Sequence, residues 1–175
     1  YGTSDKALWV NLFIGNTTEV TIDGKKVVMK QETDYPWDGL VKLTVTSEQP
    51  LGKELRIRIP GWCKSYTLSV NGNKVDSTTD KGYTVIKEWK TGDLIVLNMD
   101  MPVEKVSADP RVRQNTGKRA LQRGPLVYCL EETDNAKDFA DLALTPTSSF
   151  EVKDEPDNLG GIRSIKAISN GQTLH

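Results

Sequence analysis

The sequence predicts an all-β protein whose main part is an antiparallel, jelly-roll-like β-sandwich. Three observations lead to this fold class: apolar and polar residues alternate with a period of two, turn dipeptides separate short apolar runs, and convincing helical periodicity is scarce. The 175 residues suffice for one sizeable domain or two small ones. We assign residues 1–107 to the sandwich and residues 108–175 to the start of a second β domain that could be truncated.

Three segments show the alternation expected of half-buried strands, with one face on a core and one face in water. The residues that should point inward are Val41, Leu43 and Val45 in the first segment, Leu55, Ile57 and Ile59 in the second, and Ile95, Leu97, Met99 and Met101 in the third. Polar or charged side chains stand between most of them. Each segment is therefore predicted to be a strand that packs on the core of the sandwich.

Turn chemistry separates these strands. Asp23-Gly24 and Asn71-Gly72 tolerate the positive φ angles of a type I′ turn, so each predicts a tight hairpin. Lys90-Thr91-Gly92-Asp93 resembles a longer hairpin loop that would join a strand at 83–89 to a strand at 94–101.

The sandwich pattern is complete near Val106, and residues 107–110 resemble a connector that leads to another apolar strand at 125–130. The alternative is a single sandwich whose last strands lie in this tail. The only helix candidate is Asn135–Leu144, with Asp134 or Asn135 as its cap.

Charge and hydropathy exclude several classes of partner. Lys and Arg total 23 and Asp and Glu total 24, so the chain has no basic field to attract nucleic acid or an anionic membrane. No apolar run approaches the roughly 20 residues that span a bilayer. The opening Tyr1-Gly2-Thr3 has neither an initiator Met nor a leader pattern, so we expect a piece of a longer protein. These residues do not give the location of the parent, which is unknown; the expectation is a periplasmic or cytoplasmic bacterial protein.

The inventory of reactive side chains does not support catalysis by this chain alone. A catalytic zinc ion needs three protein ligands, and a serine or cysteine triad needs a well-held imidazole. The sequence has one histidine, the terminal His175, and two distant cysteines, Cys63 and Cys129. We therefore expect no catalytic residue and no metal site. The cysteines are expected to be buried free thiols, although a disulfide between them is open.

Paired carboxylates are the exception, because a glycosidase needs only two. Glu32, Asp34 and Asp38 surround Tyr35-Pro36-Trp37, and a Trp ring beside acids suits a sugar. Solvated acids around a structural Trp are the simpler interpretation. The four residues that we expect to contact substrate or a neighbouring domain are Asp34, Tyr35, Trp37 and Asp38.

The remaining aromatic and basic residues have simpler interpretations. Trp9 and Trp89 lie in strand patterns and are expected in the core, whereas Trp62 follows Pro60-Gly61 and could be exposed or could plug the end of the sandwich. A basic stretch is interpreted as a solvated edge strand rather than an anion site. Its members are Arg111, Arg113, Lys118, Arg119 and Arg123.

Several of these segments together resemble successive motifs of glycoside hydrolase family 127, the β-L-arabinofuranosidase family. The motifs occur in order at residues 33–39, 55–63, 69–72, 82–93 and 123–131. The resemblance covers most of residues 1–131 and little beyond residue 132.

The resemblance implies a β-sandwich region without the family's catalytic barrel. Family members carry an (α/α)6 barrel with a zinc-bound cysteine nucleophile and a glutamate acid/base, and they hydrolyse with retention. Neither Cys63 nor Cys129 belongs to the family's catalytic Cys-Cys pair. The expected role is therefore a non-catalytic scaffold, with the parent's barrel as partner, zinc on that barrel and a plant-type glycan as the parent's substrate. An independent carbohydrate-binding module and a structural or adhesion sandwich are the alternatives.

Overall fold

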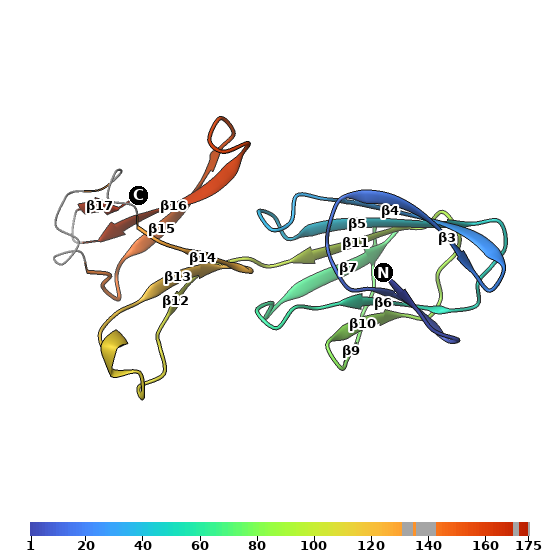
Figure 1. Cartoon of the computed structure of the whole chain (residues 1–175), viewed down its shortest axis with the longest axis horizontal. Coiled ribbons are helices and arrows are strands. Elements are labelled where there is room, and N and C mark those ends of the chain that lie inside the picture. The colour runs from blue at the N-terminus through green and yellow to red at the C-terminus, as the bar shows by residue number, and fades with distance from the viewer. Residues whose placement is uncertain (131–134, 136–142, 170–171, 175) are drawn as a thin grey trace. The chain divides into compact units, whose positions relative to one another are not determined.

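The computed structural model describes residues 1–130, 135, 143–169 and 172–174. Its regular structure is almost entirely β-strand, as the sequence predicts (Figure 1). The chain divides into two compact units, Tyr1–Met101 and Pro102–His175. The helix expected at Asn135–Leu144 falls mostly outside the described residues, and so does His175.

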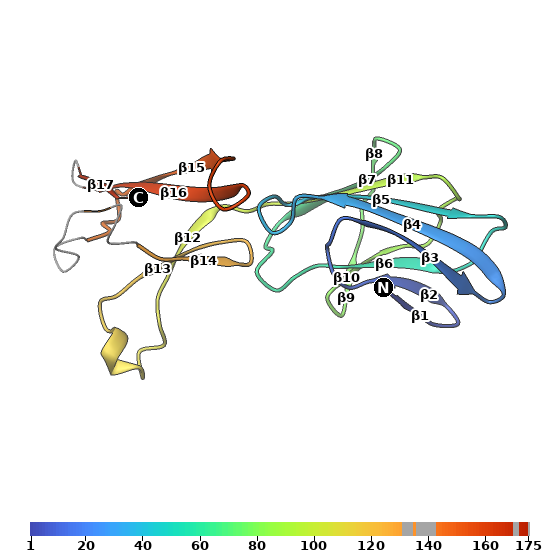
Figure 2. The same cartoon turned by 45° about the horizontal axis from the view of Figure 1, so that its top comes forward.

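The first unit is a sandwich of two sheets, which Figure 2 shows as two layers. Sheet A has the order β1 (Gly2–Thr3), β2 (Ala7–Val10), β6 (Glu54–Arg58), β10 (Tyr83–Ile86) and β9 (Thr79–Asp80). Sheet B has the order β3 (Asn16–Ile22), β4 (Lys25–Thr33), β5 (Leu40–Ser47), β11 (Leu94–Met99), β7 (Tyr66–Val70) and β8 (Asn73–Lys74).

Pairing within the two sheets is antiparallel with one exception. Strand β2 lies parallel to β6, with Leu8 opposite Leu55 and Val10 opposite Ile57. The predicted antiparallel β-sandwich is confirmed, and it contains this one parallel pair in sheet A. A parallel pair needs a long connection, and here the chain forms β3, β4 and β5 in the other sheet before it returns as β6.

The core lies between the sheets, and the predicted period-2 alternation selects it. Val41, Leu43 and Val45 of β5 are buried, and so are Ile95 and Leu97 of the neighbouring β11. Leu55 and Ile57 of β6 face them from sheet A. The alternation ends earlier than expected, because Ile59 and Met101 lie beyond their strands and are only half-buried.

Two of the three predicted turns form the expected hairpins. Asp23 and Gly24 have φ angles of 51° and 72°, and Asn71 and Gly72 have φ angles of 50° and 81°, as a type I′ turn requires. The third is a turn but not a hairpin, because β10 belongs to sheet A and β11 to sheet B. The Asp93 amide donates to Lys90 O at 3.1 Å and closes the turn. This turn carries the chain from sheet A to sheet B.

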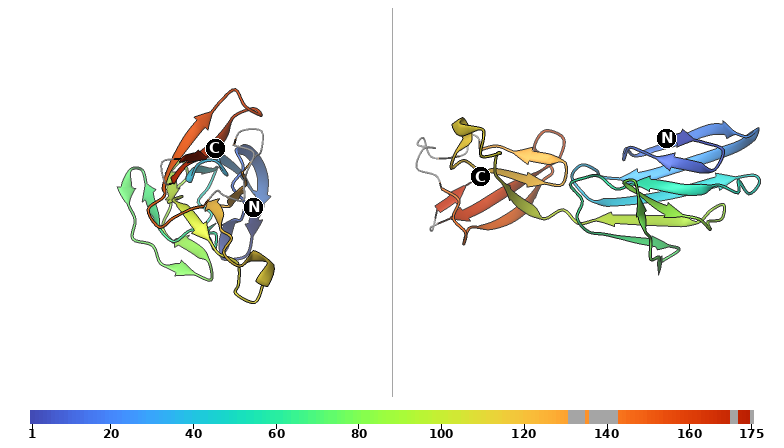
Figure 3. Two further views of the ribbon diagram at one scale, coloured as in Figure 1. Left: turned by 90° about the vertical axis from the view of Figure 1, so that its left-hand side faces the viewer. Right: turned by 90° about the horizontal axis from the view of Figure 1, so that it is seen from below.

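The second unit holds two three-stranded sheets, distinguished by colour in Figure 3. Sheet C contains β12 (Val103–Val106), β13 (Ala120–Arg123) and β14 (Leu126–Tyr128), and sheet D contains β15 (Ser149–Glu155), β16 (Ile162–Ser169) and β17 (Gln172–Leu174). The division that we placed between residues 107 and 108 lies instead between Met101 and Pro102, because β12 pairs with β13.

The basic stretch does not form an edge strand. Arg111, Arg113, Lys118 and Arg119 are exposed in the connection between β12 and β13, which includes the short 3-10 helix Arg113–Asn115. Only Arg123 lies on a strand, β13, which is the central strand of sheet C.

Candidate functional site

The predicted contact residues share the loop that joins β4 to β5. Tyr35 N donates to Thr33 Oγ1 at 3.1 Å, and Trp37 N donates to Asp34 O at 2.9 Å. The carboxylate of Asp38 accepts the amide of Leu40 at 2.7 Å. These local hydrogen bonds replace the sheet ladder and fix the loop, which is usual for Asp and Thr in turns.

The ring of Tyr35 holds this loop on the sandwich. It meets Phe13 edge-on, with ring centroids 5.4 Å apart, and stacks on Trp62 at 6.4 Å. Trp62 lies in the turn after β6, where Cys63 N donates to Pro60 O at 2.9 Å. Of the two alternatives left open for Trp62, the structure supports the plug. Phe13 was not predicted, and its only signal is the apolar segment in which it lies.

Gly39 brings the loop against the end of β11. Its carbonyl accepts Met99 N at 3.0 Å, and a Cβ atom at this position would lie 2.0 Å from Met99 O. No other residue fits so close an approach of two backbones. Gly39 therefore couples the loop to the last strand of the sandwich.

The acids of the motif do not act together. Asp34 is exposed, Asp38 is engaged within the loop, and Glu32 pairs with Lys30 at 3.0 Å on the surface of β4. Within the described ranges, no group of three or more His, Cys, Asp or Glu side chains could hold a metal ion. The zinc ion that the resemblance implies therefore does not fit these residues.

A second loop beside Tyr35 was also missed by sequence reasoning. Residues 11–15 cross from β2 to β3, and the buried side chain of Gln31 holds them. Its Nε2 donates to Leu12 O at 3.3 Å and to Ile14 O at 2.8 Å. A buried glutamine is unusual, and only tertiary structure shows that it replaces missing backbone partners.

The remaining tryptophans are structural, in two different ways. Trp89 packs against the core and donates from Nε1 to Lys53 O at 2.8 Å. Trp9 was expected in the core, which is wrong, because it lies on the outer face of sheet A. There Arg56 sits 5.0 Å from its ring centroid and Tyr83 meets it edge-on at 4.8 Å. Since Arg56 occupies one ring face, this Trp is a poor sugar platform.

Both cysteines are free thiols, so the alternative of a disulfide is wrong. Cys63 is half-buried and donates to Ser65 O at 3.2 Å, and burial raises the pKa of its thiol. Cys129 is exposed, contrary to the expected burial.

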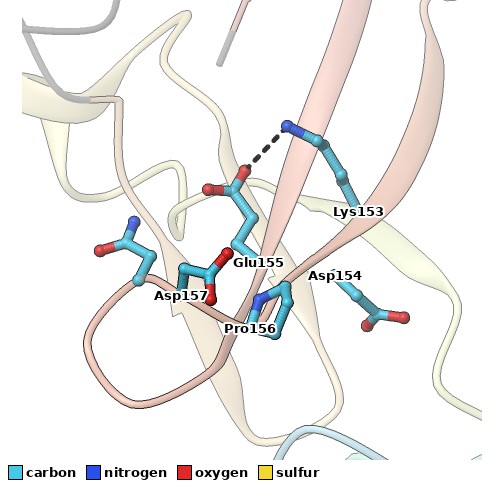
Figure 4. Close-up of a pocket in the computed structure, with 6 residues that line it drawn as sticks. Lys153, Asp154, Glu155, Pro156 and Asp157 are labelled. Atoms are coloured by element: carbon cyan, nitrogen blue, oxygen red, sulfur yellow. Dashed lines mark ion pairs between the residues drawn. The ribbon is translucent and has the colours of Figure 1, made fainter.

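A shallow open pocket in the second unit is not a convincing ligand site (Figure 4). Its six lining residues are the consecutive residues 153–158, at the end of β15 and in the turn that follows it. Lys153 and Glu155 form an ion pair at 3.5 Å, and Ser164 donates to Glu155 at 2.8 Å, which is the main reason that the pKa of Glu155 is lowered. Because one turn supplies all these groups, they do not converge on a ligand.

No helix in the described part of the chain is long and apolar enough to span a membrane.

Comparison with known proteins decides the family. Residues 7–101 match the family model described as the β-L-arabinofuranosidase GH127 middle domain, and residues 103–168 match the glycoside hydrolase family 127 C-terminal domain. The chain belongs to glycoside hydrolase family 127. The boundary between the two matched domains in the sequence coincides with the boundary between the two compact units. The resemblance seen in the sequence is confirmed, and it extends beyond residue 132.

Similar proteins in the family are much longer than this chain. The non-reducing end β-L-arabinofuranosidase of Bifidobacterium longum subsp. longum is 36% identical over 169 residues, which are 91% of this chain and 25% of that protein. The crystal structure of a GH127 β-L-arabinofuranosidase from Geobacillus stearothermophilus T6 matches with a TM-score of 0.89 and 46% identity, over 95% of this chain and 27% of that one. A solved GH127 β-arabinofuranosidase matches with a TM-score of 0.87 and 32% identity, over 97% and 31%. The chain is therefore a partial, non-barrel region of the family.

Proposed function

We propose that this GH127 region is a non-catalytic scaffold that packs on the catalytic domain of a larger glycoside hydrolase and steadies the loops of its active site. The observation that carries the proposal is the match to the family's middle and C-terminal domains, over only 25–31% of the length of the similar proteins. The structure adds a sandwich with a complete core and a structured loop end.

The parent's substrate is proposed from its relatives. Two of the similar proteins are β-L-arabinofuranosidases, so we propose a plant-type arabinofuranoside as the parent's substrate. The zinc ion, which in the resemblance binds the family's nucleophilic cysteine, would be held by the catalytic domain rather than by these residues. This region would contribute stability and loop position only.

Within the region, the loop of residues 34–38 is proposed to face the catalytic domain or its substrate. Tyr35 would act through its stack on Trp62, and Asp38 through its hydrogen bond to Leu40 N. Asp34 is exposed and Trp37 is half-buried, so these two side chains are the ones proposed to reach outward.

Three assays test this proposal. The purified chain should not hydrolyse an aryl β-L-arabinofuranoside, and its Trp fluorescence should show no saturable change when L-arabinose oligosaccharides are added. A chimera in which this chain replaces the matching region of the Geobacillus enzyme should hydrolyse the arabinofuranoside. Hydrolysis by the chain alone would overturn the proposal, and saturable sugar binding would favour an independent binding module.

A further inference from the structure

The loop between β2 and β3 exposes two large aliphatic side chains in a fixed geometry. Leu12 and Ile14 are 60% and 59% exposed, while Phe13 between them is buried against Tyr35. Gln31, only 2% exposed, holds the backbone of both residues through its two hydrogen bonds. The loop is therefore braced from inside, and its outward aliphatic groups do not depend on a mobile segment.

The sequence on either side of these two residues lacks charge. The twelve residues from Ala7 to Thr18 include no Asp, Glu, Lys or Arg, in a chain that is 27% charged. Depletion of charge around exposed apolar groups is typical of the centre of a protein interface, because no ion has to be desolvated there. An ordinary solvated loop in such a charged chain needs neither feature.

The first residue of the chain lies next to the same loop. Tyr1 is 39% exposed and donates to Asn16 Oδ1 at 3.2 Å, and the amide of Asn16 in turn donates to Ile14 O. In the family, the sandwich is a middle domain, so another domain precedes it. Chain that precedes Tyr1 in the full-length enzyme therefore arrives beside Leu12 and Ile14.

We infer that this sandwich contacts the catalytic domain that precedes it in the same polypeptide through three residues, Tyr1, Leu12 and Ile14. We call these residues the Leu12 patch. The inference rests on the proposed scaffold function and adds the surface that makes the contact. The occupant is an apolar surface of the catalytic domain, which the connection at Tyr1 keeps at high local concentration. The loop that carries Phe13 would transmit this contact to Tyr35 and the loop of residues 34–38.

Hydroxyl-radical footprinting tests the inference. Two proteins are compared: the isolated chain, and a long protein in which this chain replaces the matching region of the Geobacillus enzyme. Labelling of Leu12 and Ile14 should fall about fivefold or more in the long protein, as expected when exposed side chains become core-like at an interface. Val127, which is 69% exposed on β14 of the second unit, is the matched aliphatic control and should keep its labelling.

The outcomes separate this inference from the proposed function. Protection elsewhere in residues 1–101, with Leu12 and Ile14 still labelled, would overturn the Leu12 patch and leave the scaffold function standing. Absence of protection anywhere in residues 1–101 would overturn both. Protection in the isolated chain that rises with concentration would assign the patch to a second copy and overturn the inference.

Variants give an independent readout. Leu12→Asp and Ile14→Asp should leave the melting temperature of the isolated chain almost unchanged, since exposed substitutions have small effects. In the long protein, the same variants should shorten the half-life of hydrolytic activity at elevated temperature by about tenfold, the factor that a lost contact of about 1.4 kcal/mol gives. Val127→Asp should leave this half-life unchanged. Equal half-lives for all three variants would contradict the inference.

Discussion

The ring of Tyr35 stacks on the indole of Trp62, with 6.4 Å between the ring centroids and 22° between the ring planes. Tyr35 follows a strand of sheet B, and Trp62 follows a strand of sheet A. The stack therefore closes one end of the sandwich by joining its two layers. The indole Nε1 is buried without a hydrogen-bond partner among the described residues, so Trp62 contributes through packing.

Replacement of Trp62 should separate packing from hydrogen bonding. Trp62→Ala should lower the free energy of unfolding by about 2–3 kcal/mol, somewhat less than for a fully buried Trp. Trp62→Phe should cost clearly less, because it keeps an aromatic ring and removes a buried N–H group that has no partner. Urea denaturation measures both values. Equal losses for the two variants would contradict the packing role.

Gly39 should be intolerant of any side chain. Gly39→Ala places a Cβ atom 2.0 Å from Met99 O, which is backbone and cannot step aside, so we expect a loss of more than about 3 kcal/mol or failure to fold. Gly61→Ala is the matched control at the same end of the sandwich, with no heavy atom within 4 Å of its Cβ. Thermal melting of both variants checks this, and similar midpoints would contradict the close approach.

Lys53 is a buried cation with several fixed partners. Its side chain is 2% exposed, and Nζ lies 2.6 Å from Ser4 O, 3.2 Å from Asp5 O and 2.9 Å from the Asp23 carboxylate. Lys53→Met should lower the free energy of unfolding by about 1–2 kcal/mol, because two part-buried carbonyls lose their charged donor.

The control for Lys53 is Lys26→Met, which breaks the exposed ion pair with Glu19 and should change stability little. Chemical denaturation of both variants provides the comparison. If the Lys53 variant were as stable as the Lys26 variant, the buried contacts of Lys53 would not contribute to the fold.

Asp93 should make stability depend on pH. Its pKa is lowered first by the hydrogen bond from Lys90 N at 2.7 Å and then by the amide of Asn71 at 2.8 Å. A lowered folded-state pKa gives stability that is present above the unfolded pKa, about 3.9, and is lost as pH falls through the folded value. Asp93→Asn should therefore be less stable than the parent at pH 7, and the difference should shrink as pH falls through the lowered folded-state pKa.

Unfolding free energies between pH 2 and pH 7 test this expectation. The exposed Asp76→Asn serves as the control for loss of one surface charge. A constant difference between the Asp93 variant and the parent across this range would show that the carboxylate is not linked to folding.

Much of the sandwich follows from local sequence. The alternation in β5 and β11 fixes which side chains enter the core, and positive φ at Asp23 and Asn71 fixes two hairpins. The turn at Lys90–Asp93 could not be resolved in this way. A hairpin and a crossing between sheets use the same turn residues, and only the pairing of β10 with β6 distinguishes them.

The candidate site was predicted in part. The composition of residues 34–38 indicates an unusual loop, and its contact with substrate or the barrel stays a prediction. The structure adds that Tyr35 and Asp38 secure the loop. Phe13 and Gln31 were missed because their importance depends on contacts over long sequence distances. Trp9 was misplaced because alternation shows that a residue faces one side of a strand, not which side is the core.

The parallel pairing of β2 with β6 has a consequence for biosynthesis. Strand β2 leaves the ribosome early but has no partner on its inner side until residues 54–58 have been made. Strands β3, β4 and β5 can pair with one another in the meantime through adjacent connections. Residues 7–15, which carry no charge, thus lack their parallel partner through this stage of synthesis, and they are the part that a chaperone would bind during translation.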